Sequence, residues 1–225
     1  MKTVGPPRRD SPIEIVHFAD PWGWWSWGLE PILQRLREVY GDNVQVTYKM
    51  GGEFENLKAW MQEYGVDERG TVNWILESVA LTRMPVQPDY YFRCQVESSF
   101  PACIALKAAK LQSEYKAAKY FRRMMEAFGL KCLHATDNTL VKLGGEVGLD
   151  RDRLRKEMHS DAVEEAFEQD RQEMVRHHAN FDALLIRDRL QTGESRSVCS
   201  AEGPNQVDHR GNAQDQQDHE TGRNP

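Results

Sequence analysis

The chain has 225 residues, 40% of them apolar, and a formal net charge of −6 with an isoelectric point near 5.7. This length and apolar content can bury a substantial core, and they predict one domain or one domain with a large insertion. Lysine and arginine form no basic stripe, so we expect no nucleic-acid partner. No apolar run approaches the roughly 20 residues that cross a bilayer, so we expect no membrane partner and a cytoplasmic location.

The first predicted elements are a strand, a turn and a helix. Residues 13–18 form an apolar, β-branched run that predicts a strand, and an amphipathic pattern from Leu29 to Tyr40 predicts a helix. Between them, residues 20–31 read DPWGWWSWGLEP and hold four of the six tryptophans. Residues 44–50 alternate in polarity and predict a second strand. The order strand, helix, strand is the opening of an α/β domain with a right-handed crossover.

The middle of the chain is predicted to be helical. Apolar residues recur at helical spacing from Phe54, and residues 98–103 open a helix with a capping serine and a proline in its first turn. Stop and start signals predict further helices at about 113–128, 136–147, 150–158 and 160–178. Residues 183–186, ALLI, then predict a strand that returns to the sheet.

The composition changes at both ends of this pattern. Residues 1–12 are expected to form a flexible leader, and residues 189–225 are polar and contain no aromatic side chain. Such a tail cannot bury enough apolar surface to offset its ordering entropy, so we expect it to be disordered. The predicted domain spans residues 13–188, with a core of 13–53 and about 180–188 and a helical insertion of 54–179.

Four cysteines, at positions 94, 103, 132 and 199, show no Cys-x-x-Cys spacing. This disfavours a zinc knuckle and a local redox pair, and a reducing cytosol would keep them as thiols. Cys103 begins a helix and is a candidate reactive thiol, although cysteine is among the most buried residue types. His177 and His178 lie near Asp182, but adjacent helical residues point about 100 degrees apart, so we predict no metal site.

Several landmarks together resemble one family. They are the DP, W, WG and EP groups of residues 20–31, YG at 40–41, MGG at 50–52, SSFPAC at 98–103 and GLD at 148–150. The chain resembles the DsbA-like thioredoxin family, in particular its FrnE-type cytosolic branch. The resemblance implies an α/β fold with a thioredoxin-like sheet interrupted by a helical insertion, and a thiol-disulfide oxidoreductase site at the turn after the first strand.

The sequence differs from the pattern of this family at three places. Gly23 and Ser26 occupy the positions of the two catalytic cysteines, so dithiol exchange at this turn is chemically excluded. Asp182 occupies the position of the family's cis-proline, which normally faces the substrate. The residues after 189 lack the pattern of the family's closing hairpin and helix, so we hypothesise that the C-terminal part of the fold is incomplete or divergent.

The tryptophans of the turn have two interpretations. Trp22, Trp24, Trp25 and Trp27 are candidate substrate-binding residues that could form an aromatic platform, or they pack in the core as tryptophan usually does. Ser26 resembles the serine with which glutathione-using relatives bind a thiolate, although their serine lies at the position of Gly23. Alternatively, Ser26 caps the helix.

Three functions follow from this site. The leading hypothesis is a DsbA-like family member that has lost its dithiol, is redox-inactive or impaired, and binds at most a small thiol or a thiol- or disulfide-containing polypeptide without a cofactor. The alternative is a glutathione-dependent transferase or isomerase of the kappa or hydroxychromene-carboxylate type. A further alternative is a non-catalytic adaptor.

Overall fold

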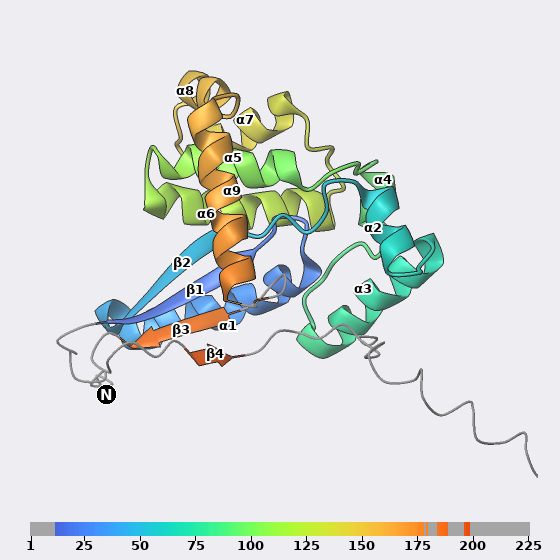
Figure 1. Cartoon of the computed structure of the whole chain (residues 1–225), viewed down its shortest axis with the longest axis horizontal. Helices are drawn as coiled ribbons and strands as arrows, with labels where there is room; N and C mark the ends of the chain where they lie inside the picture. The colour runs from blue at the N-terminus through green and yellow to red at the C-terminus, as the bar shows by residue number, and fades with distance from the viewer. Residues whose placement is uncertain (1–11, 178, 180–183, 189–195, 199–225) are drawn as a thin grey trace, which may run out of the picture.

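The sheet of the protein is mixed and small (Figure 1). A computed structural model describes residues 12–177, 179, 184–188 and 196–198, and all structural statements below refer to these residues. They contain β1 (Ile13–Ala19), β2 (Val44–Met50), β3 (Leu184–Asp188) and β4 (Arg196–Val198), in the order β2-β1-β3-β4. β1 and β2 are parallel, whereas β3 is antiparallel to both β1 and β4. The ends of β1 and β2 and the beginning of β3 therefore lie at the same end of the sheet.

Most of the remaining described residues are helical. α1 (Trp24–Tyr40) and the short 3-10 helix η1 (Gly41–Asn43) connect β1 to β2. The insertion between β2 and β3 contains α2 (Leu57–Glu63), α3 (Glu68–Thr82), α4 (Tyr90–Arg93), α5 (Phe100–Lys110), α6 (Glu114–Met125), the π-helical turn η2 (Glu126–Leu130), α7 (Asp137–Glu146), α8 (Arg151–Glu157) and α9 (Asp161–Arg176). The predicted strand-helix-strand opening, helical insertion and return strand are thus confirmed.

β1 is the central strand and is covered on both faces. Its residues from Ile15 to Ala19 are all buried. Val16 and Phe18 pack with Met174 of α9, while the ring of His17, on the opposite face, lies beside Ser26 of α1. In Figure 1, α9 passes in front of the strands and α1 lies behind them. The turn between β1 and α1 is therefore held by two packed layers.

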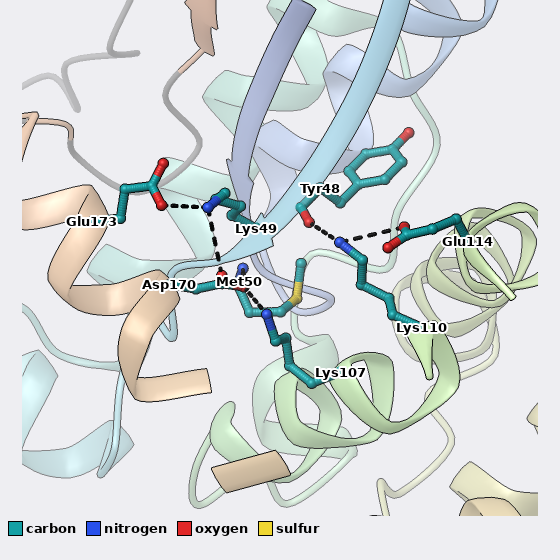
Figure 2. A network of polar contacts seen from close by, with 8 residues as sticks. All are labelled: Tyr48, Lys49, Met50, Lys107, Lys110, Glu114, Asp170 and Glu173. Carbon is teal, nitrogen blue, oxygen red and sulfur yellow. Dashed lines mark hydrogen bonds and ion pairs between the residues drawn. The ribbon is translucent and has the colours of Figure 1, made fainter. Parts of the chain in front are cut away.

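The outer edge of β2 is closed by side chains of the insertion, as Figure 2 shows. Lys110 Nζ donates to the carbonyl oxygen of Tyr48 over 2.9 Å, and the amide of Met50 donates to Asp170 Oδ2 over 3.0 Å. Lys107 Nζ lies 2.7 Å from the same carboxylate oxygen. These contacts satisfy main-chain groups that an edge strand would otherwise expose, and they fasten α5 and α9 to the sheet.

The structure corrects two boundaries. The first helix begins at Trp24, five residues before the amphipathic pattern becomes visible, because the aromatic side chains of its first turn are buried on several sides. β4 lies within the segment that we expected to be disordered, and its residues pair with Leu184–Ile186 of β3. Strand pairing uses main-chain groups, so amino-acid composition alone does not reveal it.

Candidate functional site

The turn between β1 and α1 lies where the ends of both parallel strands meet. Gly23 is the N-cap of α1, and its amide donates to the carbonyl oxygen of Asp20 over 2.9 Å. The main chain of Gly23 has φ −70° and ψ 117°, a conformation open to any residue. Among the described residues no side chain caps this helix, and the first amides of an α-helix have no acceptor within the helix. The turn is a helix start of the kind that holds an anion or activates a thiol.

Asp20 holds the turn together from beneath. Its carboxylate accepts hydrogen bonds from the amides of Trp22 and Glu53, each over 2.8 Å. The thiol of Cys103 donates to the same carboxylate over 3.4 Å. Complete burial raises the pKa of Asp20, while the hydrogen bonds oppose that rise. Asp20 thus joins the turn, the loop after β2 and the start of α5 in one buried polar cluster.

Ser26 extends this cluster toward the centre of the sheet. Its Oγ accepts from the amide of Asp20 over 3.3 Å and lies 3.5 Å from Nε2 of His17. One interpretation of the sequence was that Ser26 caps α1. In the structure Gly23 is the N-cap, and the side chain of Ser26 does not cap the helix. His17 is wholly buried, and burial together with the charge of Arg37 lowers its pKa to about 3. The imidazole is neutral at physiological pH and stabilises the turn without acting as a cation.

The tryptophans of the turn lie mainly in the core. The exposed fractions of Trp22, Trp24 and Trp27 are 1%, 7% and 6%, and Trp25 is half-buried. The ring of Trp22 stacks on Phe128 with centroids 4.1 Å apart. A hollow of about 10 Å³ beside these rings has room for about one water molecule. The aromatic side chains thus fill space between the turn and the insertion.

Two tyrosines of α4 secure the main chain of the turn. The hydroxyl groups of Tyr90 and Tyr91 both donate to the carbonyl oxygen of Trp22, the latter over 3.2 Å. The residues predicted from sequence to form the site did not include these two tyrosines or His17. A histidine within an otherwise apolar strand was the only available signal, because the contact between α4 and the turn depends on the tertiary fold.

None of the described cysteines lies in the turn itself or in α1. Cys94 and Cys103 are buried, Cys132 is half-buried, and none of the three forms a disulfide. Burial and the neighbouring Asp20 raise the pKa of Cys103 well above its ordinary value. A catalytic thiol needs the opposite shift, because the thiolate is the nucleophile. His177 is the C-cap of α9, whereas His178 and Asp182 lie outside the described residues.

A larger groove lies beside the turn. It has a volume of about 610 Å³ and is bounded by Gly51 and Gly52 after β2 and by the last two turns of α9. The amide of Gly51 donates to the carbonyl oxygen of Ala19 over 2.9 Å, which places this wall directly next to the turn. Val175 contributes an apolar side chain that is 68% exposed. The groove is large enough for several side chains of a polypeptide.

Comparison with known proteins defines the class. A family model described as thioredoxin matches residues 17–176. The cytosolic disulfide reductase DsbM of Pseudomonas aeruginosa has a similar solved structure, with a TM-score of 0.65, 21% identity, and coverage of 83% of this chain and 89% of that one. A structure of 2-hydroxychromene-2-carboxylate isomerase has a TM-score of 0.55 at 14% identity, covering 81% and 87% of the two chains.

The chain therefore belongs to the thioredoxin family, and its overall fold is similar to that of DsbM. Among curated proteins, the ClpXP adapter protein SpxH of Halalkalibacterium halodurans is 26% identical over 168 residues, which cover 73% of this chain and 55% of that protein. The chain spans about half the length of the curated relatives it matches. The assignment of Gly23 and Ser26 to the cysteine positions, and the FrnE-type branch, stay predictions. No helix within the described residues is long and apolar enough to cross a membrane.

Proposed function

We propose that the protein is a DsbA-like member that is redox-inactive at the turn before α1 and binds a polypeptide partner. The observation that carries this proposal is the start of α1, where Gly23 and Ser26 offer no sulfur to a substrate disulfide. The nearest described thiol in the polar cluster, Cys103, is wholly buried and hydrogen-bonded to Asp20. The scaffold of an exchange site is thus present without its nucleophile, while the adjacent groove is open.

The groove and the curated relatives both favour a polypeptide ligand. Its lining combines the exposed Val175 with charged side chains of α9, which suits an extended chain better than a small apolar molecule. The curated relatives carry the name ClpXP adapter, and an adapter works by binding other polypeptides. On this proposal the protein presents a bound chain to another protein without changing its disulfides.

Binding of an unfolded chain tests the proposal. The probe is insulin B chain with carboxymethylated cysteines, which can bind but cannot exchange disulfides. We expect measurable affinity by fluorescence anisotropy, weakened about fivefold or more in Val175→Asp because a charge replaces an apolar contact. Leu81→Asp is the matched control, since Leu81 on α3 is similarly exposed, at 74%, outside the groove. Equal affinity of both variants, or no binding at all, would overturn the assignment.

Glutathione binding is the second candidate function. A structure of DsbM with GSH is among the similar structures, so the fold accommodates this ligand in that protein. Here the hollow beside Gly23 measures about 10 Å³, far less than a tripeptide requires. We expect no heat of binding in a calorimetric titration with millimolar glutathione. Binding that is abolished in Gly23→Trp would favour the glutathione-dependent enzyme instead.

A further inference from the structure

Two cysteines that are distant in sequence meet beside the turn. Cys94 follows α4 and Cys132 follows η2, and the two side chains lie close enough to influence each other electrostatically. Both residues also share one main-chain acceptor, because Cys94 Sγ lies 3.7 Å and the amide of Cys132 lies 3.1 Å from the carbonyl oxygen of Phe128. The carbonyl oxygen of Phe128 therefore links the thiol of Cys94 to the main chain of Cys132.

The backbone around both thiols is unusual. Cys132 has a φ of 49°, and so does Gln95, which follows Cys94. Residues with side chains rarely adopt this left-handed conformation, and it persists where the surrounding structure imposes it. Cys132 also follows a π-helical turn, an element that is frequent at functional sites. Both cysteines therefore lie in locally irregular main chain.

We propose that Cys94 and Cys132 are a site of reversible disulfide formation with peroxides as the oxidant. The Cys132 thiolate attacks one peroxide oxygen, the oxygen–oxygen bond breaks, and Cys132 becomes a sulfenic acid while the other oxygen leaves as water. Cys94 then attacks the sulfenic sulfur, its proton joins the departing hydroxide, and a second water forms. Two thiols are oxidised to one disulfide as one hydrogen peroxide is reduced to two waters. A dithiol reductant reverses the change.

The order of attack follows from exposure. Cys132 is half-buried and accessible to a small oxidant, whereas Cys94 is buried. Burial and the adjacent Cys132 raise the pKa of Cys94 to about 12, so its thiolate is scarce at neutral pH. Cys132 is therefore the residue that reacts first, and Cys94 is the residue that resolves the sulfenic acid.

The disulfide would join the two segments that hold Trp22. Phe128 of η2 stacks on the ring of Trp22, and Tyr90 of α4 stacks on it with centroids 5.9 Å apart and donates to its carbonyl oxygen. A covalent bond between Cys94 and Cys132 restricts the opening of these segments in the unfolded and partly unfolded chain. We therefore expect oxidation to rigidify the turn, independently of whether the groove binds a polypeptide.

Mass spectrometry of the full chain after treatment with hydrogen peroxide tests this site. Digestion with trypsin and an endoprotease specific for glutamate separates Cys94 from Cys103, because Glu97 lies between them. We expect a cross-linked pair of peptides containing Cys94 and Cys132, which is lost on addition of dithiothreitol. Amide hydrogen exchange in residues 86–94 and 126–133 should slow at least severalfold in the oxidised protein.

Two variants distinguish a disulfide between Cys94 and Cys132 from oxidation of other cysteines. In Cys94→Ser, the Cys132 sulfenic acid has no resolving thiol and should be trapped by dimedone, whereas Cys103→Ser should still form the cross-link. Circular dichroism checks that each variant is folded, and the cross-link in the unmodified chain needs no variant. Oxidation of Cys132 to a sulfinic acid in the unmodified chain, or its pairing with Cys103 or Cys199, would overturn the proposal.

Discussion

Asp20 connects the turn to two other segments of the chain through hydrogen bonds. Its two carboxylate oxygens accept from amides on both sides of the sheet end, and a third donor is the thiol of Cys103. No water replaces these partners easily, because Asp20 is 1% exposed. The conformation of the turn therefore depends on this side chain even in the absence of redox chemistry.

Replacement of Asp20 should destabilise the fold. In Asp20→Ala the buried amide of Trp22 and the partly buried amide of Glu53 lose their acceptor, which costs about 2 to 5 kcal/mol in the free energy of unfolding. Asp42→Ala is the control, because Asp42 is an exposed residue of η1. Urea denaturation measures both variants. A loss below about 1 kcal/mol in Asp20→Ala would show that the cluster does not hold the turn.

His17 should make the protein sensitive to mild acid. Its pKa is about 3 in the folded chain, against an ordinary value of 6.5, so only the unfolded chain binds a proton between these values. Stability is present above pH 6.5 and is lost as the pH falls toward 3. From pH 7 to pH 5 this histidine lowers the free energy of unfolding by about 2 kcal/mol.

The contribution of His17 is isolated by a variant that does not titrate. The raised pKa of Asp20 acts in the opposite direction, so the informative quantity is the difference between the unmodified chain and His17→Gln. We expect the unmodified chain to lose more stability than His17→Gln over this pH range in urea denaturation. Parallel pH profiles would contradict the neutral, buried state of His17.

At the scale of elements, α1 and α3 pack through a glycine. A Cβ atom at Gly28 would lie 2.3 Å from Cγ2 and 2.9 Å from Cβ of Thr82. Non-bonded atoms cannot approach so closely, so the two helices can lie this near each other only because position 28 has no side chain. This contact holds the first half of α1, and hence the turn, against the insertion.

Gly28→Ala should therefore weaken this helix pair. We expect a loss of about 1 to 3 kcal/mol from overpacking, although alanine is the better helix former. Gly70→Ala in the first turn of α3 is the matched control, because a Cβ atom there would meet no atom closer than 3.3 Å. Differential scanning calorimetry should show a lower midpoint for Gly28→Ala alone, and equal midpoints would contradict the close packing.

For the whole molecule, local patterns predicted the fold better than the site. Periodicity located the strands and most helices within a few residues, because each element has its own buried face. The first turn of α1 was missed, since Trp24 and Trp25 face different neighbours and show no stripe. β4 was missed as well, because strand pairing in a polar segment leaves no apolar signature.

The site could be predicted only in part. Asp20 and Ser26 were visible within a sequence landmark, but their joint contact with His17 and Cys103 depends on how β1, α1 and α5 are placed together. The proximity of Cys94 to Cys132 was likewise invisible, since it results from the packing of α4 against η2. Contacts between distant segments follow from tertiary structure, which no local pattern contains.

The central claim is that a thioredoxin-family scaffold persists here without disulfide exchange at its turn. Reduction of insulin by dithiothreitol, followed by turbidity, tests it most directly. We predict that the unmodified chain leaves the rate equal to that of dithiothreitol alone, whereas Gly23→Cys combined with Ser26→Cys accelerates it by placing two thiols at the start of α1. Acceleration of insulin reduction by the unmodified chain would contradict the account.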